Sequence, residues 1–233
     1  MRSVDMDPHE TRGTQIAAYF DVDGTLTDTS SVTPLAWFRR RRGRLSDRIW
    51  AASLLLRGPW WMALYRLNND AGNREIYCSY AGMNAAWVRG EANACFELCI
   101  KPRLMLPMVQ RLEALKQSGV RIVLVTGGLD FIMQPVAAFL GAELIAPGLI
   151  EKNGLFTGAM SSPPLTGSAK YVAVCKHATH HNIDLHGSHA FGNEFADANM
   201  LHAVGHPVAV RPDGRLRKIA EKKSWTILDE KAE

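Results

Sequence analysis

The sequence predicts an α/β fold, in which a parallel sheet carries helices on both faces. Two compact apolar runs, QIAAYF at 15–20 and VRIVLV at 120–125, lead into small and polar residues, as buried parallel strands do where a loop begins. Stretches with helical spacing alternate with further short apolar runs along the chain. This alternation of strands and helices is typical of a parallel sheet.

The other elements of the sheet follow in order along the chain. Residues 104–117 have apolar side chains at helical spacing, and Gly119 follows as a C-cap. We then expect a helix at 131–140, a strand at 143–146, a helix at 169–182, strands at 189–191 and 207–210, and a basic C-terminal helix. Ligands of such sheets bind outside the carboxyl ends of the strands, so polar residues at those ends are candidates for a functional site.

Residues 31–103 break the alternation, because their patterns are almost wholly helical. Helices are expected at 46–56 and 60–67, separated by Gly58-Pro59, with further helical segments up to Cys99. We therefore predict an all-helical cap at 31–103, over a core formed by residues 13–30 and 104–233, and a disordered arm at 1–12. With 233 residues, the chain is long enough for a core of this size with an insert.

Positive charge is concentrated in the cap, although the net charge is only +4. The crowded arginines are Arg39, Arg40, Arg41, Arg42, Arg44 and Arg48. A solvated helix face explains such a run, and nucleic-acid binding is discounted because interleaved aromatic residues and a recognisable nucleic-acid fold are absent. A peripheral contact with an anionic membrane stays open, because the stretch Arg39 to Arg48 directly precedes the apolar stretch Ile49 to Tyr65.

That apolar stretch has two interpretations. It is interrupted by Arg57, Gly58 and Pro59, and it is shorter than the about 20 apolar residues of a membrane span. It therefore forms either core helices of the cap or an interfacial helix that touches a membrane. A phosphorylated lipid or lipid precursor would be a natural substrate in the second case.

The composition otherwise indicates a cytoplasmic protein, with peripheral membrane attachment as the alternative. The polar N-terminus has no apolar segment of the signal-peptide type, and the four cysteines lack CxxC spacing, so we expect reduced and mostly buried thiols. Five histidines between positions 177 and 189 are interpreted as surface residues, because partners at a metal-binding spacing are not found.

Asp21 and Asp23 follow the first strand two residues apart, which sends both carboxylates toward one side. One carboxylate, kept ionised by a metal and a lysine, can attack phosphorus, while the other protonates the leaving oxygen and then activates water. Gly24 lets the backbone turn closely past an anion, and Thr25 adds a hydroxyl to the same loop. A simple turn or helix cap is the alternative explanation of this string.

Later segments supply the remaining parts of a phosphate site. Thr126 ends the second strand, where its hydroxyl and the Gly127 amide can hold a phosphoryl oxygen, unless the threonine only caps the next helix. Lys170 stands at the start of a helix, where the helix dipole disfavours a cation, so it either faces an anion or is simply exposed. The segment from Gly192 to Asp197 offers carboxylate and amide oxygens suited to Mg²⁺.

The segments DVDGTLTDTS, VLVTGG, GSAK and the C-terminal stretch that begins FGNEFADANM resemble the haloacid dehalogenase-like superfamily, in the branch that includes phosphoserine phosphatases. The likeness covers residues 16–225. It implies a Rossmann-like core with a helical cap, a Mg²⁺ cofactor and a small-molecule phosphomonoester as substrate. In this family the phosphoryl group passes to an aspartate, and water then hydrolyses the acyl phosphate.

The resemblance implies a role for each candidate residue. Asp21 is the nucleophile and a metal ligand, and Asp23 is the general acid/base, whose backbone carbonyl also contacts the metal. Thr126 and Lys170 hold and neutralise the transferring phosphoryl group. The other expected site residues are Gly24, Thr25 and Gly127 for the substrate, and Asn193 and Asp197 for the metal.

Two positions depart from the family pattern. Relatives usually carry an aspartate where this chain has Asn193, and the loss of one negative charge predicts weaker Mg²⁺ binding unless Glu194 or Asp197 compensates. Phosphoserine phosphatases generally carry a glutamate nine residues after the nucleophile, where this chain has Ser30, so a different phosphomonoester is expected. The alternatives are a phosphotransferase with the same intermediate and a catalytically weakened binding protein of the same fold.

Overall fold

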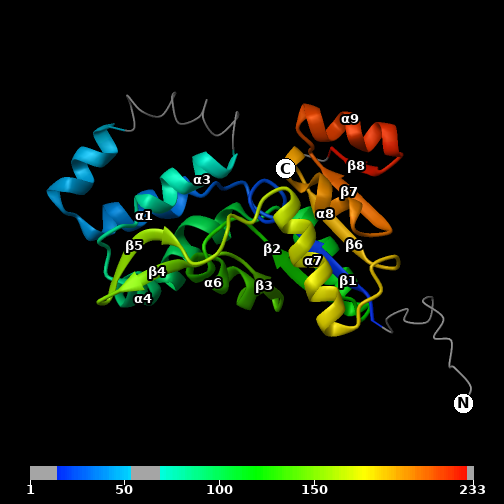
Figure 1. Cartoon of the computed structure of the whole chain (residues 1–233), viewed down its shortest axis with the longest axis horizontal. Helices are drawn as coiled ribbons and strands as arrows, with labels where there is room; N and C mark the ends of the chain where they lie inside the picture. The colour runs from blue at the N-terminus through cyan, green and yellow to red at the C-terminus, as the bar shows by residue number, and fades with distance from the viewer. Residues whose placement is uncertain (1–14, 54–68, 230–233) are drawn as a thin grey trace, which may run out of the picture.

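The computed structural model describes residues 15–53 and 69–229 and contains a six-stranded parallel sheet in the order β3-β2-β1-β6-β7-β8 (Figure 1). The strands of this sheet are β1 (Ala17–Phe20), β2 (Arg121–Val125), β3 (Glu143–Ile145), β6 (His189–Gly192), β7 (His206–Val210) and β8 (Thr226–Leu228). The central strand β1 pairs in parallel with β2 on one side and with β6 on the other. The predicted α/β fold is confirmed, although β8 was not predicted.

Alternate residues of β1 point to opposite faces of the sheet, and helices cover both faces. Ala18 and Phe20 belong to one apolar core, whereas Ala17 and Tyr19 belong to a second, and all four residues are fully buried. This explains why the strand is continuously apolar rather than alternating. The helices of the first core are α5 (Leu106–Gln117) and α6 (Asp130–Leu140), and those of the second are α7 (Ser168–His181), α8 (Ala198–His202) and α9 (Gly214–Lys223).

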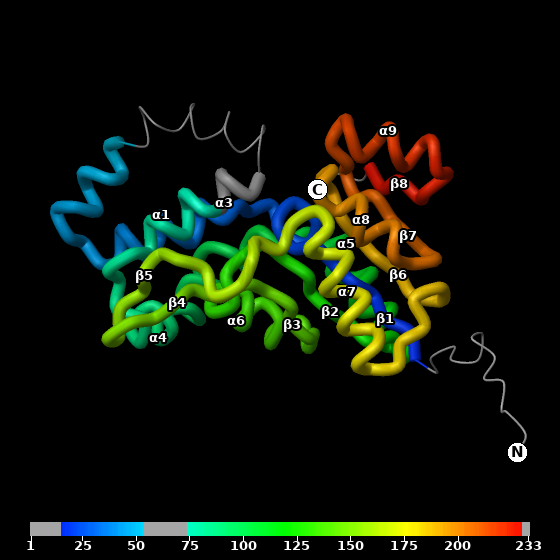
Figure 2. Tube along the Cα trace, viewed as in Figure 1, coloured from blue at the N-terminus to red at the C-terminus, as the bar shows by residue number. Residues whose placement is uncertain are grey.

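The insert between β1 and α5 consists mainly of helices in its described part. These are α1 (Val32–Arg42), residues 45–53, α3 (Asn69–Cys78), α4 (Ala85–Cys95), a π-helical turn (Phe96–Ile100) and a 3-10 turn (Lys101–Arg103). Buried side chains of the insert, among them Phe38, Tyr80 and Val88, join the core that contains α5 and α6. Figure 2 shows the helices of the insert gathered at one side of the molecule, next to α6.

Part of the predicted cap lies outside the described residues. The helix expected at 60–67 and most of the apolar stretch 49–65 belong to that part. Across residues 15–53 and 69–229, the structure contains no helix with both the length and the apolar character required to cross a bilayer.

A β-hairpin that was not predicted packs against the insert. Its strands are β4 (Leu149–Lys152) and β5 (Leu155–Met160), which pair antiparallel. Asn153 and Gly154 join them with positive φ values of 53° and 74°. The Gly82 amide of the insert donates to the Phe156 carbonyl at 2.8 Å, and the Phe156 amide donates to Met83 at 2.9 Å. Asn-Gly between two strands is a strong hairpin signal, so this element was detectable in the sequence.

The arginine run at the end of α1 is only in part a solvated helix face. Arg39 Nη1 lies 3.2 Å and Arg42 Nε lies 2.9 Å from the buried carboxylate of Asp47, which fastens residues 45–53 to α1. The exposed arginines of the run are Arg40, Arg41, Arg44 and Arg48. Contact with an anionic membrane stays a prediction, because most of the adjoining apolar stretch lies outside the described residues.

The burial of the cysteines differs from the expectation. All four are free thiols, but only Cys95 is buried, while Cys78 is exposed and the others are partly exposed. The expectation of mostly buried cysteines is therefore wrong. The helices that carry them turn only one face to the core, and composition alone does not indicate which face a cysteine occupies.

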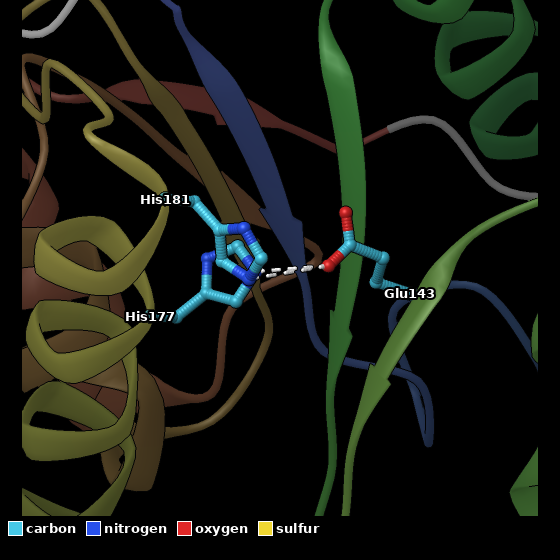
Figure 3. A group of neighbouring side chains, drawn as sticks. All are labelled: Glu143, His177 and His181. Carbon is cyan, nitrogen blue, oxygen red and sulfur yellow. Dashed lines mark hydrogen bonds and ion pairs between the residues drawn. The ribbon is translucent and has the colours of Figure 1, made fainter.

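Glu143, the first residue of β3, meets two histidines of α7 near the amino ends of the strands (Figure 3). His177 and His181 lie one helical turn apart, and their side chains are only 9% and 31% exposed. The interpretation as surface residues is therefore wrong for His177, which the edge of the sheet covers, whereas His181 remains partly exposed. His180 and His186 are exposed, as expected.

Asp47→Asn should destabilise the protein. Burial alone would raise the pKa of Asp47, but hydrogen bonding to Arg42 and the charges of Arg42 and Arg39 outweigh it and lower this pKa. The amide would leave two partly buried guanidinium groups without their counter-charge, so the free energy of unfolding should fall by about 2–4 kcal/mol in urea denaturation. Glu91→Gln, which breaks the exposed pair with Arg41, is the matched control and should cost less than about 1 kcal/mol. Equal losses in both variants would contradict this role of Asp47.

Candidate active site

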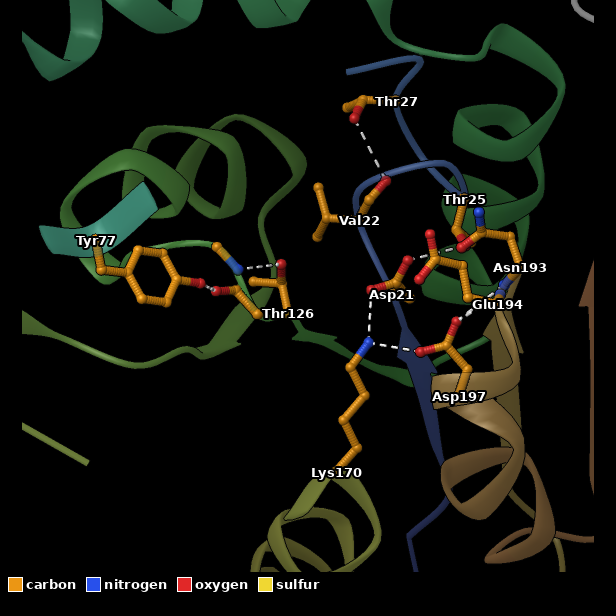
Figure 4. Close-up of polar contacts among 12 residues, drawn as sticks. Asp21, Val22, Thr25, Thr27, Tyr77, Thr126, Lys170, Asn193, Glu194 and Asp197 are labelled. Carbon is orange, nitrogen blue, oxygen red and sulfur yellow. Dashed lines mark hydrogen bonds and ion pairs between the residues drawn. The ribbon is translucent and has the colours of Figure 1, made fainter. Parts of the chain in front are cut away.

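Asp21 begins a tight turn at the carboxyl end of β1. Its amide donates to the Phe191 carbonyl at 2.9 Å, which extends the pairing of β1 with β6. The carbonyl of Val22 then accepts three amides of the turn, those of Thr25, Leu26 and Thr27, at 3.2, 2.9 and 3.0 Å. The turn thus reverses the chain directly after Asp21 and leaves its carboxylate at the end of the sheet (Figure 4).

Lys170 is buried between two carboxylates. Its Nζ lies 2.6 Å from Asp21 Oδ1 and 2.6 Å from Asp197 Oδ1, and the side chain is 4% exposed. Burial alone would lower the pKa of Lys170, but the charges of Asp197 and Asp21 outweigh it and raise this pKa. The lysine therefore stays charged, and its place in the first turn of α7 is explained by the two anions that it faces.

The carboxylates of Asp21 and Asp23 are harder to ionise than ordinary aspartates. Burial raises the pKa of Asp21 to about 7, helped by the charges of Asp197 and Asp23 and opposed by Lys170. Burial also raises the pKa of Asp23, against a hydrogen bond from the Thr29 hydroxyl at 2.9 Å. Asp23 is thus placed to hold a proton beside Asp21, as a general acid must.

The loop after β2 presents a hydroxyl to the same site. Thr126 is buried, and its Oγ1 accepts the Gly128 amide at 2.9 Å, so the hydroxyl proton is available for another acceptor. Tyr77 from α3 donates its hydroxyl to the Gly127 carbonyl and so ties this loop to the insert. Tyr77 was missed because it stands in no recognisable motif, and only the folded chain brings it here.

Asp21 and Asn193 present oxygens to the same point. The Thr25 hydroxyl lies 3.1 Å from Asp21 Oδ2 and 3.2 Å from Asn193 Oδ1. One hydroxyl proton satisfies only one of these acceptors, so the pair keeps acceptor capacity for a hard cation, and the donor set fits Mg²⁺. Gly24 permits this approach, because it has a φ of 83° and a Cβ there would lie 2.1 Å from Asn193 Nδ2.

Asp197 supports this arrangement through both of its oxygens. Oδ1 contacts Lys170, while Oδ2 accepts the amides of Asn193 and Glu194 at 3.0 Å each. The Glu194 side chain accepts the Asp197 amide in return. Asp197 therefore orients Lys170 and the turn that carries Asn193, with both of its oxygens engaged by protein groups.

The predicted site residues converge on one polar pocket of about 50 Å³. Those that line it are Asp21, Asp23, Thr126, Gly127, Lys170, Asn193 and Asp197, and Gly24 and Thr25 adjoin it through Asn193 and Asp21. The lining also includes Ser31, Leu165 and Thr166, which had not been singled out. Ser31 directly follows the matching segment DVDGTLTDTS, which is the signal that could have found it. Ser30 is exposed and outside this lining.

A model of the family described as haloacid dehalogenase-like hydrolase matches residues 18–202. The chain belongs to this family. Among its relatives, a probable phosphatase of Mycobacterium tuberculosis is 29% identical over 219 residues, which is 91% of this chain and 74% of the relative. A phosphoserine phosphatase of the same organism is 26% identical over 216 residues, which is 91% of this chain and 70% of the relative. The predictions of the superfamily and of a phosphatase are thereby confirmed.

Solved structures resemble this haloacid dehalogenase-like hydrolase over almost its whole length. A protein of unknown function from Bordetella pertussis Tohama I matches with a TM-score of 0.76 and 26% identity, over 93% of this chain and 99% of that one. A substrate-bound phosphoserine phosphatase matches with a TM-score of 0.70 and 18% identity, over 93% and 94% of the two chains. The second likeness shows a shared fold.

In this hydrolase, Asp21→Asn should raise stability without divalent cations at about pH 8. The pKa of Asp21 is about 7 in the folded chain, above its ordinary value of 3.8, so folding favours the protonated carboxyl. That contribution is fully present below the unfolded pKa and is lost as the pH rises through about 7. Asparagine avoids the cost of a buried, ionised carboxylate. In thermal unfolding with EDTA, the variant should therefore have a higher unfolding midpoint than wild type at about pH 8, and the difference between the two midpoints should shrink toward about pH 5. A difference in midpoint that stays constant with pH would contradict the raised pKa of Asp21.

Proposed function

We propose that this phosphatase is a Mg²⁺-dependent phosphomonoester hydrolase that works through an aspartyl phosphate on Asp21. The observation that carries the proposal is the placement of the Asp21 carboxylate between Lys170 and Thr25, in the pocket that Asp23 and Thr126 also line. A nucleophile, an acid, a cation and a hydroxyl donor thus surround a space of phosphoryl size. The phosphatases among the relatives support this chemistry.

In the proposed reaction, an oxygen of Asp21 attacks phosphorus, and the bond from phosphorus to the leaving oxygen breaks. Asp23 gives its proton to the leaving oxygen, which its raised pKa favours. Water then attacks the phosphorus of the aspartyl phosphate and passes a proton to Asp23, which releases inorganic phosphate and restores Asp21.

The phosphoryl oxygens must be held while this happens. Lys170 and Thr126 both line the pocket, Lys170 from α7 and Thr126 from the position directly after β2. Lys170 would neutralise developing charge, and the Thr126 hydroxyl would donate to a phosphoryl oxygen. Asp21, the Asp23 carbonyl and Asn193 would hold Mg²⁺, supported by Asp197, and the cation would lower the repulsion between the carboxylate and the phosphate.

The proposed substrate is a small phosphorylated metabolite or a phospholipid-related phosphomonoester. The polar pocket of about 50 Å³ accounts for the phosphoryl group, so the leaving group must be recognised by residues around its rim. One relative is named a phosphoserine phosphatase, but Ser30 here cannot supply the carboxylate that those enzymes use for the amino group. We therefore expect other phosphomonoesters to be better substrates than phosphoserine.

Hydrolysis of p-nitrophenyl phosphate tests the reaction. Wild-type protein should release p-nitrophenol in millimolar Mg²⁺ and not in EDTA, and Asp21→Asn should lose at least about 10³-fold in kcat because no aspartyl phosphate can form. Asp23→Asn should retain the ability to be phosphorylated by this substrate, whose leaving group needs little protonation, but should release phosphate slowly.

The matched control is Asp28→Asn, an exposed aspartate in the same segment that does not line the pocket. It should keep near wild-type rates. Activity that survives in Asp21→Asn, or that is lost equally in Asp28→Asn, would reject Asp21 as the nucleophile.

A catalytically weakened binding protein is the second candidate, and Asn193 is the observation that favours it. Asn193→Asp should lower the Mg²⁺ concentration for half-maximal activity by about tenfold, because it adds a negative charge next to Asp21 and Thr25. If wild type shows no turnover at any Mg²⁺ concentration while Asn193→Asp does, the second candidate is correct. If both are active with equal Mg²⁺ dependence, Asn193 does not contact the metal.

A further inference from the structure

A second group of potential ligands lies at the other end of the sheet from the phosphatase site. Glu143 is the first residue of β3, whereas Asp21 and Thr126 follow the carboxyl ends of their strands. His177 and His181 belong to the last two turns of α7, whose first turn carries Lys170. The cluster therefore plays no part in the proposed phosphoryl transfer, and nothing in that reaction explains why these side chains meet.

The ligand atoms of this cluster already have nearly the spacing that a metal requires. Glu143 Oε2 lies 3.2 Å from His177 Nε2 and 3.8 Å from His181 Nε2, and one ligand atom from each residue lies within 4.8 Å of the others. A tetrahedral zinc ion with bonds of about 2.1 Å separates its ligands by about 3.4 Å. Histidines four residues apart on a helix present their rings on one face, as in known zinc sites.

Neighbouring side chains orient two of the three potential ligands, His177 and Glu143. The hydroxyl of the buried Tyr19 lies 3.1 Å from His177 Nδ1, which leaves Nε2 facing Glu143. Arg121 Nη1 donates to Glu143 Oε1 at 2.9 Å, so Oε2 is the oxygen turned toward both histidines (Figure 3). Partners of this kind hold histidine and carboxylate ligands in most metal sites.

Arg121 also contacts His181, and this contact must change when a metal binds. Its Nη1 lies 3.0 Å from His181 Nδ1, and a guanidinium only donates, so the ring proton is on Nε2. Coordination through Nε2 moves that proton to Nδ1 and breaks the contact. Arg121 then keeps Glu143 Oε1 and the Gln15 side chain, which lies 3.3 Å from its Nη2.

We propose that Glu143, His177 and His181 form a site for one divalent transition-metal ion, with Zn²⁺ as the preferred ion. Two imidazoles and one carboxylate select such borderline ions over Mg²⁺, which prefers oxygen. His181 is partly exposed, so water can complete the coordination. The ion would fasten the end of α7 to the edge strand β3 and thereby add to the stability of the folded chain.

Calorimetric titration and thermal unfolding of untagged protein with zinc chloride test this site. Millimolar Mg²⁺ is kept present so that hard-cation sites are filled. Wild type should bind one Zn²⁺ per chain, and free zinc at about 100 times the dissociation constant should raise the unfolding midpoint by roughly 5–10 °C. Asp21→Asn should bind zinc as wild type does. This result would show that the zinc site is distinct from the phosphatase site, whether or not the proposed phosphatase reaction is correct.

Variants of the three ligands should weaken zinc binding at least about tenfold and remove the shift. His181→Gln and Glu143→Gln alter partly exposed side chains, so they should fold normally, as unfolding without zinc will verify. His180→Gln is the matched control, because this exposed histidine lies on the same helix outside the cluster. The proposal is overturned if wild type binds no zinc at micromolar concentrations, or if the ligand variants bind it as tightly as His180→Gln.

Discussion

The buried contact of Lys170 with Asp21 and Asp197 is the interaction on which the rest of the site depends. Two carboxylates replace water around the charged lysine, each 2.6 Å from Nζ. Through it, three segments far apart in the sequence become one unit: the end of β1, the first turn of α7 and the turn at 193–197. Asp197 also holds the turn that carries Asn193, because its second oxygen accepts the backbone amides of Asn193 and Glu194.

The same contact leaves the pocket electrically unbalanced. Three buried or partly buried aspartates, Asp21, Asp23 and Asp197, surround a single lysine, and the pKa of Asp21 is raised as a result of burial and of the neighbouring carboxylates. Carboxylates gathered in this way repel one another, and a divalent cation bound between them would offset that repulsion. Asn193 suits the proposed metal site for the same reason. It keeps an oxygen in place and, as a neutral ligand, relieves part of the repulsion between the carboxylates.

The parts of the structure that follow from short-range chemistry were predictable from the sequence. Strand β1 is a continuous apolar run, and β2 is apolar after its first residue, Arg121. Lys170 was a candidate because the helix dipole disfavours a cation at a helix start, although an exposed lysine was the alternative. Tyr77 and Asp47 were not predictable, because each depends on a partner that only the folded insert provides: the Gly127 carbonyl for one and a pair of arginines for the other. The hairpin at 149–160 differs, since its Asn153-Gly154 turn is a local signal in the sequence.

Helix α7 shows how one element can serve both ends of a parallel sheet. Lys170 projects from its first turn toward the carboxyl ends of the strands, while His177 and His181 lie two and three turns later, level with the first residue of β3. Val174 and Ala178, buried in the core between them, fix the rotation of the helix. That rotation turns Lys170 toward Asp21 at one end of the helix and the two histidines toward Glu143 at the other. The proposed metal site and the phosphatase pocket therefore share one rigid helix but no ligand.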